Sequence, residues 1–86
     1  MRVEPTPKPG AGSKPARIDT RGLYCPVPIL RTRDRLRSLE PGAVLEVWAD
    51  DPAILVDMPA FCRSHGHEYL GQETEEGAWL VALRKK

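Results

Sequence analysis

The sequence has 86 residues, enough for one domain with a small core, because a chain near this size buries only about 60% of its unfolded surface. Such a core leaves little room for a deep substrate cavity. The 13 Lys and Arg residues nearly balance the 12 Asp and Glu residues, and the net charge of +1 excludes a large field that would attract a polyanion.

The first residues contain no apolar run typical of a secretory signal, and no apolar stretch reaches the roughly 18 residues of a membrane-spanning helix. We therefore expect a cytoplasmic protein without direct membrane contact. In a reducing compartment the two cysteines, Cys25 and Cys62, are expected to be free thiols.

Residues 1–16 contain four of the nine prolines, two glycines and three basic residues. This composition predicts a disordered N-terminal tail followed by one domain over residues 17–86. The short alternating pattern of residues 17–20 predicts a first strand, which ends at Gly22.

Apolar residues at helical spacing then predict an amphipathic helix from Pro26 to about Leu39, ended by the Pro-Gly pair of residues 41–42. Residues 43–49 are rich in β-branched and aromatic side chains and predict a central strand.

The apolar stripe within residues 53–66 predicts a second helix, although Pro59 suits a helix interior badly. The regular helix begins either near residue 53 or near Asp57, with Asp57 as N-cap and Pro59 in the first turn. The pattern leaves both starts open.

Two further strands are expected at about residues 67–73 and 78–84, joined as a hairpin through residues 74–77. The predicted order is strand, helix, strand, helix, strand, strand. With so few elements, both helices should cover one face of a mixed four-stranded sheet, which makes an α/β (α+β) two-layer sandwich. The other face is then open, and apolar side chains such as Trp48 are expected on it.

Cys25 lies where the first loop meets the first helix, in the run CPVP of residues 25–28. Pro26 is expected at the first helical position, and Pro28 still fits within the first turn. Backbone N–H groups and the helix dipole at such a place favour a thiolate, so we expect Pro26, Val27 and Pro28 to support a lowered pKa for Cys25. The same field would stabilise a persulfide anion.

No His or acidic residue lies beside Cys25 in the sequence, so a Cys–His pair of the hydrolase type would have to arise through folding. A second cysteine in a Cys-x-x-Cys arrangement is absent, which argues against a dithiol oxidoreductase.

Four segments together resemble the TusA/SirA family of sulfur carriers. They are DTRGLYCPVP at residues 19–28, DDPA at 50–53, DMPAFC at 57–62 and GHE at 66–68. The resemblance covers roughly residues 17–86. Val27 departs from it, since acidic residues are common there in the family, and we expect the difference to affect the choice of partner.

The resemblance implies a βαβαββ sandwich similar to the C-terminal domain of translation initiation factor three. It implies a sulfurtransferase in which Cys25 accepts sulfur as a persulfide from a cysteine desulfurase or related donor and passes it to an acceptor protein. Its branches serve 2-thiouridine synthesis in tRNA, molybdenum-cofactor assembly or sulfur metabolism. No cofactor is implied besides the covalent persulfide sulfur on Cys25.

Other reactive residues have simpler interpretations. Cys62 lies beside the apolar stripe of the second helix and is expected to pack in the core, with a resolving thiol as the alternative. A zinc site from Cys25, Cys62, His65 and His67 is disfavoured because Cys25 has no ligand at short spacing. His67 is expected to make ordinary hydrogen bonds at the start of a strand.

The first helix contains four arginines at alternate positions 31–37. They form either a solvated face, partly paired with Asp34 and Glu40, or a partner-docking surface on which Leu30, Arg33 and Arg37 share a flank. Asp51, with Asp50, is expected to form the turn and cap before the second helix, and it is also a candidate for the edge of the docking surface.

Two other functions compete with sulfur transfer. A nucleic-acid-binding module would use the arginine helix, but the balanced charge predicts no strong nucleic-acid binding by the protein itself. A redox-regulatory module would oxidise Cys25 without transferring sulfur.

Overall fold

The computed structural model describes residues 15–86. The six elements are β1 (Ala16–Asp19), α1 (Val27–Leu36), β2 (Val44–Ala49), α2 (Ile54–His65), β3 (Glu68–Glu75) and β4 (Ala78–Arg84). Their order is the predicted one. The first strand begins and ends one residue earlier than expected, and most of the predicted tail, residues 1–14, lies outside the described residues.

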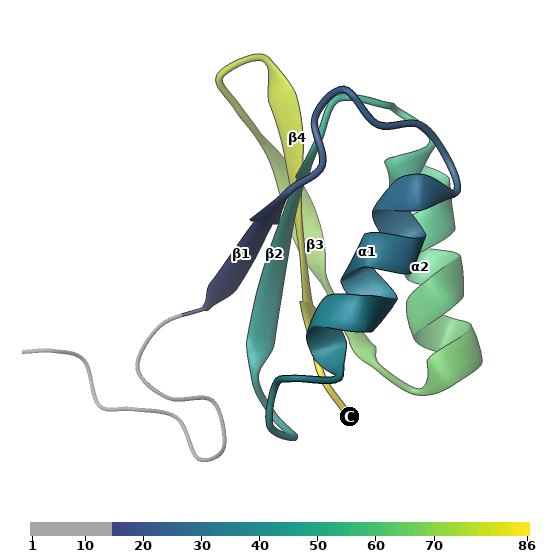
Figure 1. The fold of residues 1–86 in the computed structure, drawn as a ribbon, viewed down its shortest axis with the longest axis vertical. Helices are drawn as coiled ribbons and strands as arrows, with labels where there is room; N and C mark the ends of the chain where they lie inside the picture. The colour runs from purple at the N-terminus through teal and green to yellow at the C-terminus, as the bar shows by residue number, and fades with distance from the viewer. Residues whose placement is uncertain (1–14) are drawn as a thin grey trace, which may run out of the picture.

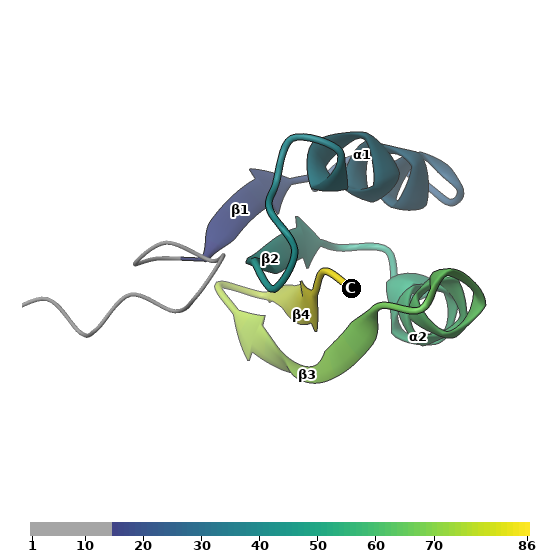
Figure 2. The same ribbon diagram turned by 90° about the horizontal axis from the view of Figure 1, so that it is seen from below.

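The four strands form one mixed sheet in the order β1-β2-β4-β3. β1 pairs with β2 in parallel, whereas β4 is antiparallel to both of its neighbours. Both helices cover the same face of this sheet and lie side by side (Figures 1 and 2). The predicted two-layer sandwich is therefore confirmed.

The core lies between the helices and the sheet. Along β2 the burial alternates, with Leu45, Val47 and Ala49 completely buried and the residues between them half-buried, as expected for a strand with one covered face. Met58 and Cys62 of α2 pack against this surface. The apolar stripe of each helix thus determines how the helix lies on the sheet.

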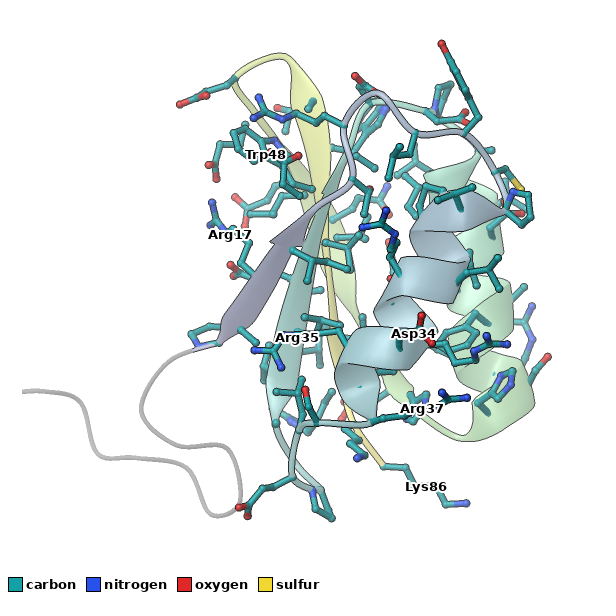
Figure 3. The ribbon with its side chains drawn as sticks, in the orientation of Figure 1. Arg17, Asp34, Arg35, Arg37, Trp48 and Lys86 are labelled. Carbon is teal, nitrogen blue, oxygen red and sulfur yellow. The ribbon has the colours of Figure 1, made fainter. Side chains whose placement is uncertain are left out.

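The other face of the sheet is open. Arg17 of β1 forms ion pairs with Glu46 of β2 and Glu75 of β3, at 3.1 and 3.0 Å. Trp48 lies half-buried on this face, as predicted, under the guanidinium of Arg21, which is 3.4 Å from the ring centroid. Figure 3 shows Arg17 and Trp48 on the side of the sheet away from the helices.

The first helix is shorter than predicted at both ends. Pro26 is the N-cap instead of the first helical residue, and its peptide bond with Cys25 is cis. At the other end the helix stops at Leu36, three residues early. After Leu36 the chain continues in turns whose backbone hydrogen bonds join residues three apart. The Lys85 ammonium donates to the carbonyls of Leu36 and Leu39. These bonds satisfy acceptors that a helix end leaves free.

The second helix begins at Ile54 with Ala53 as N-cap, and Pro59 lies inside it. The alternative start at Asp57 is therefore wrong. Proline removes one helical hydrogen bond, but a helix that began at Asp57 would lose Ile54 from the buried stripe, where it is 2% exposed. Gly66 ends the helix in the left-handed conformation, with φ of 81°.

The hairpin between β3 and β4 is tighter than predicted. The third strand runs from Glu68 to Glu75, and only Glu76 and Gly77 connect it to β4. Both have positive φ, 54° and 78°, as in the two-residue turns that match the twist of antiparallel strands. Residues 74 and 75, expected in the connection, extend the strand.

Candidate functional site

Two loops meet at one end of the sandwich, where the parallel strands β1 and β2 end. The β1–α1 and β2–α2 connections lie together at the top of Figure 1. The Thr20 N–H and hydroxyl both donate to the Trp48 carbonyl, at 2.7 and 2.8 Å, and the Gly22 N–H donates to the Asp50 carboxylate at 3.1 Å. Gly22 has φ of 84°, a conformation that costs glycine little. The first loop is thus attached to the second.

Asp51 connects the cysteine loop to the second helix. One carboxylate oxygen accepts the Cys25 N–H at 3.1 Å, and the other accepts the Ala53 N–H at 3.0 Å. These two donors hold the pKa of Asp51 below its usual range, with Ala53 contributing most. Asp51 forms the predicted turn before the second helix, but the predicted cap is wrong, because Ala53 is the N-cap and no side chain caps α2. The contact of Asp51 with Cys25 is an addition that folding provides.

The Cys25 side chain is exposed and donates a hydrogen bond to the Asp57 carboxylate, with 2.8 Å between Sγ and Oδ2. Asp57 belongs to the first turn of α2 and is 32 residues away in the sequence. From the sequence, Asp57 was expected only as a possible helix cap. Its place in the DMPAFC segment of the family resemblance was the signal that it has a further role.

The environment of Cys25 contradicts the expected lowering of its pKa. The hydrogen bond to Asp57 raises the pKa of the Cys25 thiol, and desolvation and the charges of Asp57 and Asp51 raise it further. These contacts therefore favour the protonated thiol of Cys25 over the thiolate.

The start of α1 explains why the helix dipole does not lower the pKa of Cys25. Pro28 has no N–H, the Val27 N–H donates to the Tyr24 carbonyl at 2.8 Å, and the Leu30 N–H donates to the Pro26 carbonyl at 3.1 Å. At most one backbone donor of the first turn remains for a sulfur anion. The prolines that fix the loop also remove the groups that would stabilise a thiolate.

Three of the four candidate docking residues lie on α1 or directly after it. Leu30 is 40% exposed. Arg33 and Arg37 are exposed and share the Asp34 carboxylate, at 3.8 and 3.6 Å, so the predicted pairing with Asp34 is present. Arg37 follows the end of the helix remote from Cys25 (Figure 3). Two exposed apolar residues near the site were not predicted, Tyr24 beside Cys25 and Val56 beside Asp57, at 73% and 72% exposure.

Cys62 is 1% exposed in the core, as predicted, and burial raises its pKa to about 11. His65 and His67 lie at the other end of α2 from Asp57, and the Nδ1 atom of His67 accepts the Lys86 N–H at 3.1 Å. Within residues 15–86, no three Cys, His or acidic side chains gather as metal ligands. No helix in this part of the chain is long and apolar enough to cross a membrane.

Comparisons with known proteins point to one family. Residues 16–85 match the family described as Sulfurtransferase TusA. A Pseudomonas entomophila protein named sulfur carrier protein TusA is 45% identical over 71 residues, which cover 83% of this chain and 89% of that protein. A Bacillus subtilis protein named putative sulfur carrier protein YrkF is 47% identical over 79% of this chain, but the match spans only 37% of that relative.

A solved structure has the same fold. The SirA-like protein from Desulfitobacterium hafniense superposes with a TM-score of 0.66 at 29% identity, covering 80% of this chain and 95% of that one.

Proposed function

Because this chain belongs to the TusA family of sulfur carriers, we propose that Cys25 accepts sulfane sulfur as a persulfide from a donor enzyme and relays it to an acceptor protein. The donor is a cysteine desulfurase or a related sulfurtransferase. The observation that most supports this role is the position of Cys25, whose thiol is exposed on a loop fixed by hydrogen bonds to Asp50 and Asp51.

Loading is an exchange between two sulfur centres. The Cys25 sulfur attacks the outer sulfur of the donor persulfide, a new S–S bond forms on Cys25, and the donor S–S bond breaks with its electron pair on the donor cysteine. The Cys25 proton leaves to solvent or to the donor thiolate. Delivery repeats this exchange with an acceptor thiol as the attacking group, so neither step needs an external oxidant or reductant.

The surroundings of the sulfur suit contact with a second protein. Tyr24, Leu30 and Val56 are exposed apolar side chains on the three segments around it, and buried cores of protein interfaces are enriched in such residues. We assign Leu30, Arg33 and Asp51 to the docking surface, with Arg37 at its outer edge.

The proposal is tested by incubating the protein with a cysteine desulfurase and cysteine and measuring its mass. We expect a gain of about 32 Da, one sulfur atom in a persulfide, which reducing agent removes. Cys25→Ser should not gain this mass, whereas the matched Cys62→Ser variant should. An adduct that persists in Cys25→Ser would show that the sulfur is bound elsewhere.

A further inference from the structure

We infer that Asp57 restrains Cys25 in the free protein. Its carboxylate accepts a hydrogen bond from the thiol and orients the cysteine side chain, so that the sulfur reacts slowly until a partner engages the site. The inference deepens the proposed function, on which its biological purpose rests. It predicts that removal of the Asp57 charge will increase the intrinsic reactivity of the Cys25 sulfur.

The contact is built from two sides of the fold. The Cys25 N–H is held by Asp51, and the Cys25 thiol is held by Asp57. Asp51 is in turn attached to Ala53, one residue before α2. Main chain and side chain of the cysteine are therefore both attached to the start of the same helix, which makes the short Sγ to Oδ2 distance a property of the packed fold.

Asp57 is well placed to accept a hydrogen bond from the sulfur. It lies in the first turn of α2, where the helix dipole favours an anion. A charged carboxylate accepts hydrogen bonds but cannot donate them, so the proton between the two groups belongs to the sulfur. A hydrogen bond to the neutral form of a thiol opposes its ionisation.

The other charges around the sulfur act in the same direction. Asp51, from the β2–α2 loop, adds a second negative charge, and both carboxylates raise the pKa of Cys25. The nearby Arg21 is paired with Asp19 at 2.9 Å, and on α1 Arg33 lies against Asp34. Within residues 15–86, no basic side chain forms an ion pair with Asp51 or Asp57.

A restrained thiol suits a carrier. Peroxide and small electrophiles react with the thiolate, so a protonated Cys25 is protected although it is exposed. A cationic group that a partner places against Asp57 would reduce the negative charge beside the sulfur and favour its ionisation.

The test compares wild type with Asp57→Asn, which keeps the shape of the side chain but removes its charge. The alkylation rate of Cys25 by iodoacetamide is measured by mass spectrometry from neutral to alkaline pH. Glu73→Gln is the matched control, because it also replaces one carboxylate by an amide. Glu73 is an exposed residue of β3, outside the cysteine site. Urea denaturation verifies that each variant is folded.

We expect the alkylation midpoint of Asp57→Asn to move to lower pH and its rate at neutral pH to rise several-fold, with no change in Glu73→Gln. An unchanged or higher midpoint in folded Asp57→Asn would overturn the inference. If Asp57→Asn does not fold, the thiolate absorbance of Cys62→Ala, in which Cys25 is the one remaining thiol, provides the second measurement. Its midpoint should then lie above that of a cysteine in a short peptide, and a midpoint at or below the peptide value would overturn the inference.

The two proposals fail in different ways. A wild-type protein that gains no sulfur from a desulfurase, while Asp57→Asn alkylates faster, would refute the relay and leave the restraint in place. A protein that loads normally but has the same alkylation profile with and without the Asp57 charge would refute only the restraint.

Discussion

The Asp51 carboxylate accepts the backbone N–H of Cys25 at 3.1 Å, although 26 residues separate the two along the chain. Its second oxygen accepts the Ala53 N–H before α2. One side chain thus holds both the loop that presents the sulfur and the start of the helix that provides Asp57. The reactive loop and the fold are therefore coupled through Asp51.

Asp51→Ala should lower the urea midpoint of unfolding and slow persulfide loading, because both N–H groups lose their acceptor. Asp51→Asn keeps one acceptor oxygen and should lie between the alanine variant and wild type. The comparison needs denaturation curves and loading rates for all three proteins. Equal midpoints and equal loading rates would show that Asp51 does not couple the loop to the helix.

Met58→Ala should destabilise the protein by about 2–5 kcal/mol, the usual range for removing a large buried side chain. Met58 is completely buried in the core, with 0% solvent exposure, whereas Val56 on the same helix is 72% exposed. Val56→Ala, the matched control, should change the free energy of unfolding by less than about 0.5 kcal/mol. Urea denaturation measures both, and similar losses would contradict the assigned core.

Stability should fall at alkaline pH partly because of Cys62. Burial raises its pKa to about 11, so from the ordinary thiol pKa of about 8.5 up to that value the unfolded chain loses a proton that the folded chain keeps. The free energy of unfolding therefore decreases as the pH rises through this window. The contribution of Cys62 is complete below the unfolded pKa and is lost as the pH rises through the folded pKa.

Cys62→Ala removes this contribution, and its stability should depend less on alkaline pH than that of wild type. Cys25, whose pKa is also raised, contributes in both proteins and cancels in the comparison. Desolvation, the main cause of the raised pKa of Tyr69, also remains, whereas the smaller effect of the Cys62 charge on Tyr69 is lost in the variant and changes the comparison in the same direction. Parallel stability curves for the two proteins would mean that Cys62 ionises without opposing the fold.

Leu30→Gln should slow loading from a protein donor several-fold, because it places a polar amide in the proposed docking surface, but it adds no charge and should not change alkylation of Cys25 by a small reagent. Leu70→Gln is a matched control, since Leu70 of β3 has 39% exposure against 40% for Leu30. If both variants load at the wild-type rate, the surface around Leu30 is not where the donor docks.

Much of the fold follows from local patterns. The alternation in β2 and the helical stripes predicted the element order and the covered sheet face, because these periods decide which side chains reach the core. Element ends were less predictable. Helix α1 ends at Leu36 because Lys85, almost fifty residues away, binds its carbonyls, and Pro59 is tolerated in α2 because Ile54 is needed in the core.

Cys25, its proline-flanked loop and the family resemblance could all be read from the amino-acid sequence, since each rests on short runs of consecutive residues. The raised pKa of the Cys25 thiol, by contrast, follows from contacts that exist only in the folded chain. A helix N-terminus predicts a thiolate, but folding brings Asp57 and Asp51 against Cys25, and two nearby carboxylates outweigh a helix start whose prolines lack N–H donors. A pKa depends on what surrounds a group in space, and for Cys25 those surroundings come from residues 26 and 32 positions further along the chain.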